Sequence, residues 1–413
     1  MKALVLAGGF PQIALLEELK RRNIYTVLAD YYAEPVAKPH ADKFYQVSTL
    51  DVEAITRVAR EENVDFLITA CTDQALLTVA RVSEQLSLPC YIDYKTALNV
   101  TNKSFMKKVF VENNIPTAKH LILGELDTAK ISKLKYPLIV KPVDCNSSKG
   151  VKKVLTEKEL HNAFSEAVQL SRTKTAIIEE FVQGREISVD VYVENGKAHI
   201  LAVSNSDKIA DADKFVIWRS RYPADEFSPK LNQRVAETIQ KIADGFGIKD
   251  APMLVQMITD GENVYVLEFS ARTGGGVKYR LIKKVSGFDV ISAVIDLTFG
   301  IKPHVEISEP ENKYISNEFI YCRPGIFERL EGFEEAKQAG IISEYFLFKW
   351  KGAQFDSISN SGDRIAGFTI QGDSDEEMCE KHNKALEMIR VLNTNGENMI
   401  RFDLITDWYS QIK

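Results

Sequence analysis

The stretch of residues 255–276 places the strongest constraint on how this chain can fold. Two apolar runs rich in β-branched residues, 255–258 and 264–267, flank the polar turn Asp-Gly-Glu-Asn at residues 260–263. Runs of this kind on either side of a short, Gly-containing turn are typical of a β-hairpin. We therefore expect an antiparallel strand pair here, followed by a Gly-rich turn at residues 273–276.

Polar side chains on one face of this hairpin suit a magnesium ion. Side chains alternate between the two faces of a strand, so Glu268 and Ser270 share a face, while Gln256 lies on the neighbouring strand. Mg²⁺ is usually held by one or two carboxylates together with substrate phosphates. Arg272 continues the face and would add positive charge for a phosphoryl group. The alternative interpretation is a half-buried strand that ends in an ordinary surface turn.

The first hundred residues have the pattern of a small parallel sheet. A continuous apolar run at residues 3–7 is typical of a strand buried on both faces. The segments that follow predict helices over 13–21, 52–62 and 74–86 and strands over 26–30, 66–69 and 89–92. Because β-α-β units give parallel strands, we expect a flavodoxin- or Rossmann-like doubly wound domain here.

This domain lacks the sequence of a dinucleotide-binding site. Its first turn reads GGFP at residues 8–11 and not G-x-G-x-x-G. Ligands of open α/β sheets bind at the carboxyl ends of strands, where Asp30, Thr72 and Asp73 lie. These residues are candidates for a co-substrate site, and the alternative is that they cap helices.

After about residue 100 the pattern changes to an α+β block. It predicts helices over 101–111 and 157–170 and strands over 137–140, 176–181, 186–193 and 198–205. The region 311–413 again alternates strands and helices, with a helix expected over 376–392. It carries no chemical motif and is expected to be a small cap that completes the pocket.

Two lysines and a polar loop are candidates for binding phosphate. Lys103 begins a helix, and Lys141 ends an apolar strand, where its stem is apolar and its charged head points to a cleft. Loops such as residues 144–151 can curl successive N–H groups around phosphate oxygens, although this one is not a Walker loop. The loop residues with a candidate role are Ser147, Ser148, Lys149 and Gly150. The alternatives are solvated lysines and an ordinary turn.

An acidic strand end is a candidate for binding adenosine. An apolar run leads directly into Glu179 and Glu180, followed by Phe181 and Val182. Their backbone and apolar groups could contact an adenine ring, and a carboxylate could accept from its amino group. Glu186, seven residues after Glu179, could accept hydrogen bonds from ribose hydroxyls. The alternative is an exposed acidic turn.

Taken in order, these motifs resemble the ATP-grasp superfamily, most of all the branch of carbamoyl-phosphate synthase large-subunit-like proteins and L-amino-acid ligases. The motifs are NK at 102–103, PLIVKP at 137–142, SSKGV at 147–151, EEFV at 179–182 with Gly184 and Glu186, and EFSAR at 268–272. The resemblance covers about residues 1–300 and implies a multidomain α/β and α+β fold. Its parts would be an N-terminal domain (1–100), an ATP-grasp domain of two α+β subdomains gripping ATP (101–310, with a mobile lid at about 117–185) and a C-terminal cap (311–413).

The resemblance also implies roles for individual residues. For ATP these are Lys103 and Lys141 on the phosphates, residues 147–150 as the covering loop, Glu179, Glu180, Phe181 and Val182 around adenine, and Glu186 on the ribose. For Mg²⁺ they are Gln256, Glu268 and Ser270, and for catalysis Arg272 and Lys141. In two places the chain departs from the family pattern, with Ser270 in place of Asn and Gln256 in place of an acid.

Candidate substrate contacts lie at positions that resemble a substrate-facing strand or loop of the family. Arg219 or Arg221 could clamp a carboxylate, and Trp218 could wall the pocket. Gly275 and Arg280, in and beyond the Gly-rich turn, are further candidates. Each could instead be a loop anchor.

Composition excludes several other classes of protein. With a net charge of −6 and no basic stripe, the chain is not expected to bind nucleic acid. No apolar run approaches the roughly 18 residues of a membrane span. Five scattered cysteines without a CxxC pair favour a reduced, cytoplasmic protein.

We therefore predict a cytoplasmic, ADP-forming carboxylate–amine ligase that uses ATP and Mg²⁺, or Mn²⁺ in its place. It would join two small molecules through an acyl phosphate and would form a homodimer by analogy. The alternatives are a bicarbonate-using carboxylase or carbamoyl-phosphate synthase-like enzyme, and a non-catalytic ATP-binding module.

Overall fold

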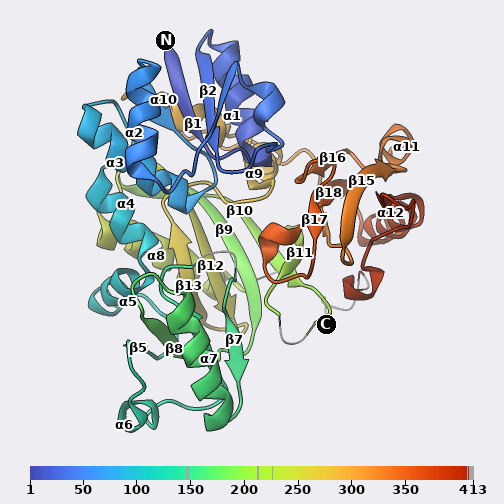
Figure 1. Cartoon of the computed structure of the whole chain (residues 1–413). Helices are drawn as coiled ribbons and strands as arrows, with labels where there is room; N and C mark the ends of the chain where they lie inside the picture. The colour runs from blue at the N-terminus through green and yellow to red at the C-terminus, as the bar shows by residue number, and fades with distance from the viewer. Residues whose placement is uncertain (146–147, 212–213, 226, 407, 409–413) are drawn as a thin grey trace.

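The computed structural model describes residues 1–145, 148–211, 214–225, 227–406 and 408. Figure 1 shows an N-terminal part in blue, a central part in green and yellow, and a C-terminal part in orange and red at one side. No helix among the described residues is long and apolar enough to cross a membrane.

The N-terminal part is a four-stranded parallel sheet with the strand order β3-β2-β1-β4. Its elements are β1 (Lys2–Leu6), α1 (Phe10–Arg21), β2 (Tyr25–Asp30), η1 (Lys38–His40), β3 (Lys43–Gln46), α2 (Val52–Glu61), β4 (Phe66–Ile68) and α3 (Asp73–Leu86). Strand β1 is apolar throughout its interior because helices cover both faces of the sheet: α2 and α3 pack on one, α1 on the other. The expected parallel α/β domain is confirmed.

One predicted strand is wrong, and another was missed. Residues 89–92 are not a strand, because Ile92 packs into the core beneath the central part and the Tyr91 hydroxyl donates to the carbonyl of Ala271 at 3.2 Å. Packing, not strand pairing, buries this apolar run. The missed strand of this four-stranded sheet is β3. Its residues are half-buried or exposed, so its sequence carries no strong apolar signal.

A small antiparallel sheet, order β5-β8-β6-β7, follows two linking helices. The elements are α4 (Tyr94–Thr101), α5 (Lys103–Glu112), β5 (His120–Leu123), α6 (Thr128–Ile131), β6 (Leu138–Pro142), β7 (Lys152–Val154), α7 (Glu157–Leu170) and β8 (Ala176–Glu180). The Asn102 side chain caps α5 by accepting from the amide of Ser104 at 2.9 Å, which places Lys103 at the first helical position. Figure 1 shows this unit at the bottom, with α7 against the sheet.

An eight-stranded sheet, order β13-β12-β9-β10-β11-β14-β18-β16, runs through the central and C-terminal parts of the molecule. Its central elements are β9 (Arg185–Glu194), β10 (Lys197–Lys208), β11 (Ile217–Tyr222), α8 (Pro229–Phe246), β12 (Ala251–Thr259), β13 (Val264–Ser270), α9 (Lys278–Ser286) and α10 (Val290–Thr298). The predicted hairpin is β12–β13, with Gln256 directly opposite Glu268.

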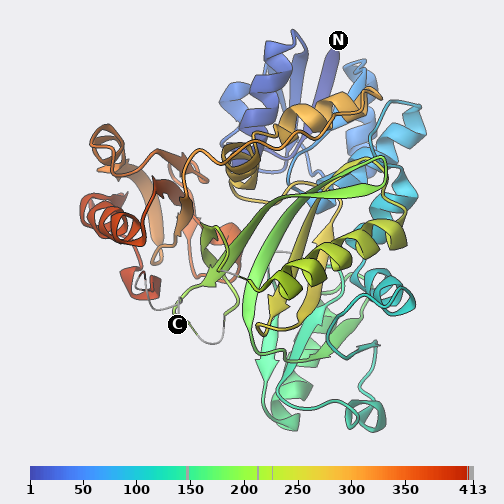
Figure 2. The same ribbon diagram turned by 180° about the vertical axis from the view of Figure 1, so that it is seen from behind.

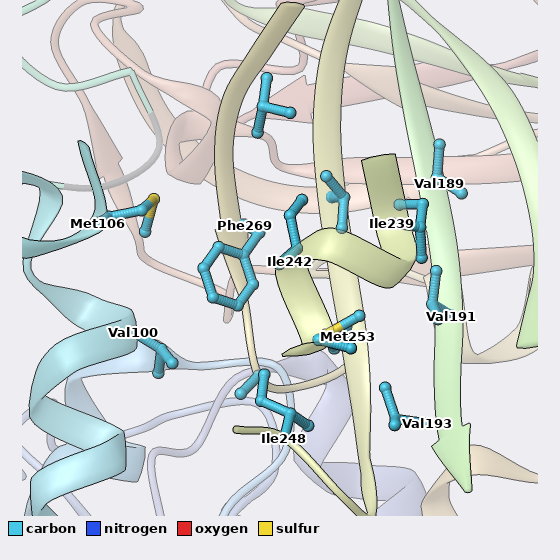
Figure 3. Packing of buried hydrophobic residues seen from close by; sticks show 14 of the residues in the cluster. Val100, Met106, Val189, Val191, Val193, Ile239, Ile242, Ile248, Met253 and Phe269 are labelled. Carbon is cyan, nitrogen blue, oxygen red and sulfur yellow. The ribbon is translucent and has the colours of Figure 1, made fainter. Parts of the chain in front are cut away.

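Apolar packing holds this sheet against its helices. Helix α8 lies across the back of the sheet in Figure 2. In Figure 3, Val189 and Val191 of β9 lie beside Met253 of β12 and Ile239 of α8, and Phe269 of β13 lies toward α5. Helix α10 packs instead against α1 of the N-terminal part.

The C-terminal part continues the large sheet and adds a three-stranded sheet, order β17-β15-β19. Its elements are β14 (Tyr314–Ile320), β15 (Gly325–Glu331), α11 (Phe333–Gln338), β16 (Glu344–Leu347), β17 (Gln354–Phe355), η2 (Ser361–Asp363), β18 (Ala366–Gly372), α12 (Asp375–Met388), β19 (Arg390–Asn393) and η3 (Phe402–Leu404). The prediction of one helix over 376–392 is wrong at its end, because α12 stops at Met388 and the next residues form β19. Strand β19 pairs with β15, and this pairing buries Val391 completely.

Candidate active site

Two adjoining cavities lie between these parts. The first, of about 120 Å³, lies between the small sheet and the large one. The second, of about 580 Å³, is bounded by the N-terminal part, the large sheet and the C-terminal part. Ser148, Gln256 and Glu268 line both cavities, so they mark where the two meet.

Glu179 binds two lysines beside the first cavity. Its carboxylate oxygens lie 2.6 Å from the Nζ atoms of Lys107 and Lys141, and all three side chains are at least nine-tenths buried. Burial acts to raise the pKa of Glu179, but the two lysines outweigh it and hold this pKa at about 2. For Lys107 burial prevails and lowers the pKa, whereas the nearby acids raise that of Lys141 against burial. Lys141, which lines the cavity, is therefore a firmly charged cation.

Lys103 and Glu268 form a second pair at the junction of the cavities. The Nζ atom of Lys103 lies 2.9 Å from Glu268 Oε2 and donates to the carbonyl of Cys145 at 2.8 Å. Burial acts to raise the pKa of Glu268, but Lys103 and Lys141 together bring it below its usual value. Glu268 is thus an ionised carboxylate that lines both cavities.

Glu186 lines the first cavity beside two polar partners. Its carboxylate lies 2.8 Å from Lys208 Nζ and accepts a hydrogen bond from Gln256 Nε2 at 3.2 Å. Gln256 itself lines both cavities.

The strand end after Glu179 forms a wall of the first cavity that is apolar at Phe181 and Val182. Glu180, Phe181 and Val182 all line it, and the Phe181 amide donates to the carbonyl of Pro137 at 2.9 Å. The Phe181 ring also lies 3.9 Å from the ammonium of Lys153. An apolar wall beside charged groups suits a flat, polar ligand.

The predicted phosphate loop borders the same cavity. Ser148 and Lys149 line it, and the Ser148 hydroxyl donates to the carbonyl of Phe215 at 3.0 Å, which ties the loop to the large sheet. Gly150, at φ +74°, packs where a Cβ would meet Leu170 at 2.7 Å. Ser147 lies outside the described residues.

The candidate metal ligands do not form a closed cage. Gln256 and Glu268 line the cavities, whereas Ser270 does not and instead helps to lower the pKa of the Asp73 carboxyl. In the part of the chain that the structure describes, no three His, Cys, Asp or Glu side chains gather to hold a metal by themselves. One carboxylate and one amide fit a cation whose remaining ligands are phosphate oxygens and water.

Arg272 lines the second cavity and is held by the N-terminal part. Its Nε donates to Asp73 Oδ1 at 2.8 Å, its Nη2 binds the other carboxylate oxygen, and its Nη1 donates to the carbonyl of Thr273 at 2.8 Å. Burial opposes both charges, yet their attraction lowers the pKa of Asp73 and raises that of Arg272. The arginine is therefore oriented as well as charged.

The expectation that Trp218, Arg219 and Arg221 face a substrate is wrong. Trp218 and Arg219 are fully buried, and the guanidinium of Arg219 lies between the rings of Trp218 and Trp408, 4.7 Å from each. Arg219 donates to Asp207 at 2.6 Å, and Arg221 lies 3.6 Å from the same residue. Of strand β11, Ile217 and Ser220 line the cavity instead.

The two candidates beyond the metal strand differ from each other. Gly275 lines the second cavity. Arg280 does not: it binds Glu344 and packs over Phe10 and Phe346. Arg280 joins the N-terminal and C-terminal parts and is not a substrate contact.

Several cavity residues were missed. Lys278, at the start of α9, lines the second cavity, binds the Ser204 hydroxyl and lies 3.4 Å from Asp190. Asn317, Lys349 and Arg364 line it from the C-terminal part. A lysine directly after a Gly-rich turn was a usable signal for Lys278, whereas the other three have no local motif.

Comparison with known proteins agrees with this geometry. Residues 134–280 match the ATP-grasp domain family, so the chain carries an ATP-grasp domain. The formate-dependent phosphoribosylglycinamide formyltransferase of Sulfurisphaera tokodaii is 28% identical over 66% of this chain and 70% of its own length. The carbamoyl phosphate synthase large chain of Clostridium botulinum strain Langeland is 23% identical over 71% of this chain, which spans only 27% of that protein.

The fold also matches solved structures over almost the entire chain. The L-amino acid ligase of Bacillus licheniformis superposes with a TM-score of 0.79 at 20% identity, covering 95% of this chain and 99% of that one. The predicted order of a parallel α/β domain, an ATP-grasp fold and a C-terminal α+β region is therefore confirmed as the fold.

Proposed function

We propose that this chain, whose central part is an ATP-grasp domain, is an ATP-dependent carboxylate–amine ligase. The observation that carries the proposal is the pair of adjoining cavities that meet at Gln256 and Glu268. One is charged and flanked by an apolar strand end, which suits a nucleotide. The other is larger and contains an oriented arginine, which suits two reacting small molecules.

The first cavity would bind ATP. Lys103 and Lys141 would meet its phosphates, Glu186 the ribose, and the segment 179–182 the adenine ring. Its volume of about 120 Å³ lies below the roughly 300–1,000 Å³ of typical small-molecule sites. ATP would therefore enter only if the small sheet moves away from the large one, which supports a lid at about residues 117–185.

Glu268 and Gln256 would hold Mg²⁺, or Mn²⁺ in its place, with Ser270 contributing at most through water. When bound, the metal supplies neutralisation of the charge on the transferring phosphoryl group. Glu268 fits this task because Lys103 and Lys141 keep it ionised.

The chemistry would take place where the two cavities meet. A substrate carboxylate attacks the γ-phosphate and forms an acyl phosphate and ADP. An amine then attacks the acyl carbon, and inorganic phosphate leaves the tetrahedral species. Arg272 and Lys141 would stabilise the developing charge, and no side chain forms a covalent intermediate.

The size of the second cavity distinguishes this proposal from its alternatives. Bicarbonate and ammonia are far smaller than 580 Å³, so a carbamoyl-phosphate synthase-like reaction, or a carboxylase with a small acceptor, would leave most of the cavity unused. A non-catalytic module would bind ATP and release no phosphate.

Phosphate release from ATP and Mg²⁺ tests the proposal against a matrix of small carboxylic acids and amines, with bicarbonate plus ammonia as one condition. We expect release that requires one acid and one amine together. Glu268→Ala should lower the rate by roughly 10²–10³-fold, as for other losses of electrostatic stabilisation at a reacting group. The matched control is Glu262→Ala, an exposed residue in the turn of the same hairpin.

Three results would contradict the proposal. Release with bicarbonate alone would favour a carboxylase, and ATP binding without release in any condition would favour the module. A Glu268→Ala variant as active as Glu262→Ala would refute the metal-site assignment. Circular dichroism and ADP binding of both variants separate loss of function from loss of fold.

A further inference from the structure

The C-terminal part presents three side chains with unused hydrogen-bond donors to the second cavity. They are Asn317 on β14, Lys349 just after β16 and Arg364 just before β18. They lie far apart in the sequence, but β14 and β16 are both paired with β18 in the large sheet. The fold thus gathers these three donors on one wall.

The guanidinium of Arg364 is held in one orientation by two aromatic rings and a backbone carbonyl. Its guanidinium lies 4.2 Å from the Phe319 ring centroid and 5.5 Å from that of Phe348, and its Nε donates to the carbonyl of Ser361 at 2.5 Å. Among the described residues no carboxylate pairs with it, and burial lowers its pKa. The orientation is fixed, while the Nη donors are left for a ligand.

Arg364 also reaches the Gly-rich turn that follows Arg272. A Cβ on Gly276 would lie 2.8 Å from Nη1 of Arg364, so any side chain there would displace the guanidinium. The C-terminal wall therefore borders the site of reaction.

Lys349 and Asn317 have unmet donors as well. No acid of the described residues lies within ion-pair distance of Lys349, and Asp363 acts on it only as a nearby charge. Asn317 is 2% exposed; its Oδ1 accepts from Thr369 at 2.6 Å, whereas its Nδ2 has no partner. A buried donor left without an acceptor is unfavourable, and a bound ligand would remove that cost.

The other two cations of the second cavity differ in this respect. Arg272 is paired with Asp73, and Lys278 lies beside Asp190. Neither Arg364 nor Lys349 forms an ion pair with a residue that the structure describes, so the positive charge of the C-terminal wall is not already held by a carboxylate.

We infer that Arg364, Lys349 and Asn317 form a subsite for an anionic group, a carboxylate or a phosphate, carried by the amine substrate. The inference rests on the proposed function and narrows it. The carboxylate that is activated must reach Glu268 and Arg272, so a second anion on the other wall belongs to the second substrate. A planar guanidinium with a flanking ammonium suits an oxyanion of either kind, because it donates two parallel hydrogen bonds. Ammonia and simple alkylamines lack such a group and would be poor substrates.

Calorimetric titration of the nucleotide-free protein tests the subsite directly. The probes are glutarate, inorganic phosphate, O-phosphoethanolamine and the neutral analogue glutaramide. We expect the anions to bind and glutaramide not to bind, and the tighter class of anion identifies carboxylate or phosphate as the natural group. Arg364→Ala and Lys349→Ala should each weaken anion binding by roughly ten- to a hundredfold, as expected for the loss of a charged hydrogen-bond donor.

Lys351→Ala is the matched control. Lys351 stands two residues after Lys349, but its side chain is 72% exposed and pairs with Glu328. We expect this variant to bind the probes as the unmodified protein does. Because Lys349 is on a loop, its variant keeps the test valid if Arg364→Ala does not fold.

Binding of no anion, equal binding of glutaramide, or equal anion affinity in both wall variants and in Lys351→Ala would overturn the inference. The assay needs neither ATP nor turnover, so it can fail while the ligase proposal stands, and the reverse. Once the amine is known, Arg364→Ala should raise its KM and leave the KM for ATP unchanged. Amidation of the amine's anionic group should have the same effect and should make the rate insensitive to Arg364→Ala.

Discussion

Replacement of Glu179 by Gln should destabilise the protein strongly, because this single carboxylate neutralises two buried lysines. Each Nζ–O distance is 2.6 Å, and at an effective dielectric constant of about 20 each pair has an attraction of roughly 6 kcal/mol. Desolvation of the three groups offsets most of that attraction. The substitution removes the attraction but leaves the ammonium groups of Lys107 and Lys141 buried, so we expect a loss of about 3–5 kcal/mol in the free energy of unfolding.

Urea unfolding followed by circular dichroism measures this loss, and hydrogen exchange of the β6 and β8 amides shows whether it occurs in the small sheet. Glu380→Gln is the control: its partner Lys384 is one helical turn away and the two side chains are 64% and 53% exposed. That pair should contribute about 0.5 kcal/mol or less. If Glu179→Gln costs no more than Glu380→Gln, the two buried ion pairs do not stabilise the small sheet and the reasoning is refuted.

The pH dependence provides a second check on the same residue. The folded-state pKa of Glu179, about 2, lies below its usual value of 4.5. Its contribution is therefore complete above about pH 4.5 and is lost as the pH falls toward 2. The stability difference between the unmodified protein and Glu179→Gln should shrink over that window, and a constant difference would contradict the assignment.

Two further substitutions, and a control for the second, test contacts around the second cavity. Asp73→Asn removes the carboxylate that orients Arg272. We expect kcat/KM to fall roughly ten- to a hundredfold, as for the loss of a charged hydrogen bond. An unchanged kcat/KM would show that Arg272 does not need Asp73. Gly276→Ala and Gly300→Ala both place a side chain at a positive φ, +69° and +74°, but only the first would touch other side chains, those of Arg364 and Phe319. Both should lower the melting temperature, and only Gly276→Ala should also weaken binding of the anionic probes; equal probe binding would contradict the position of Arg364.

Local patterns were enough to predict the half of the site that lies on consecutive strands. The turn at residues 260–263 fixes the β12–β13 hairpin, and strand alternation then places Glu268 on the face that meets Gln256. In the same way, an apolar strand that ends in Lys141 predicts a cation at the rim of a cavity. These features depend on neighbours in the sequence, so no knowledge of the tertiary structure was needed.

The other half depends on which strands become neighbours. Asn317, Lys349 and Arg364 face one cavity only because β14 and β16 are paired with β18. Strand β11 shows a related limit, since the sequence IWRSRY has polar residues on both faces. Alternation separates Arg219 from Ser220, but only the packing of Trp408 over Arg219 decides that the arginine faces away from the cavity that Ser220 lines.

The N-terminal part is explained by the same long-range contacts. It has no dinucleotide-binding turn, yet Gly8, Gly9 and Asp30 line the second cavity and Asp73 binds Arg272. Asp73 is the first residue of α3, so the position of that helix relative to the hairpin sets the orientation of the arginine. Removing the parallel sheet would therefore take away one wall of the cavity and the partner of Arg272, although the nucleotide contacts proposed for the first cavity would all remain on the chain.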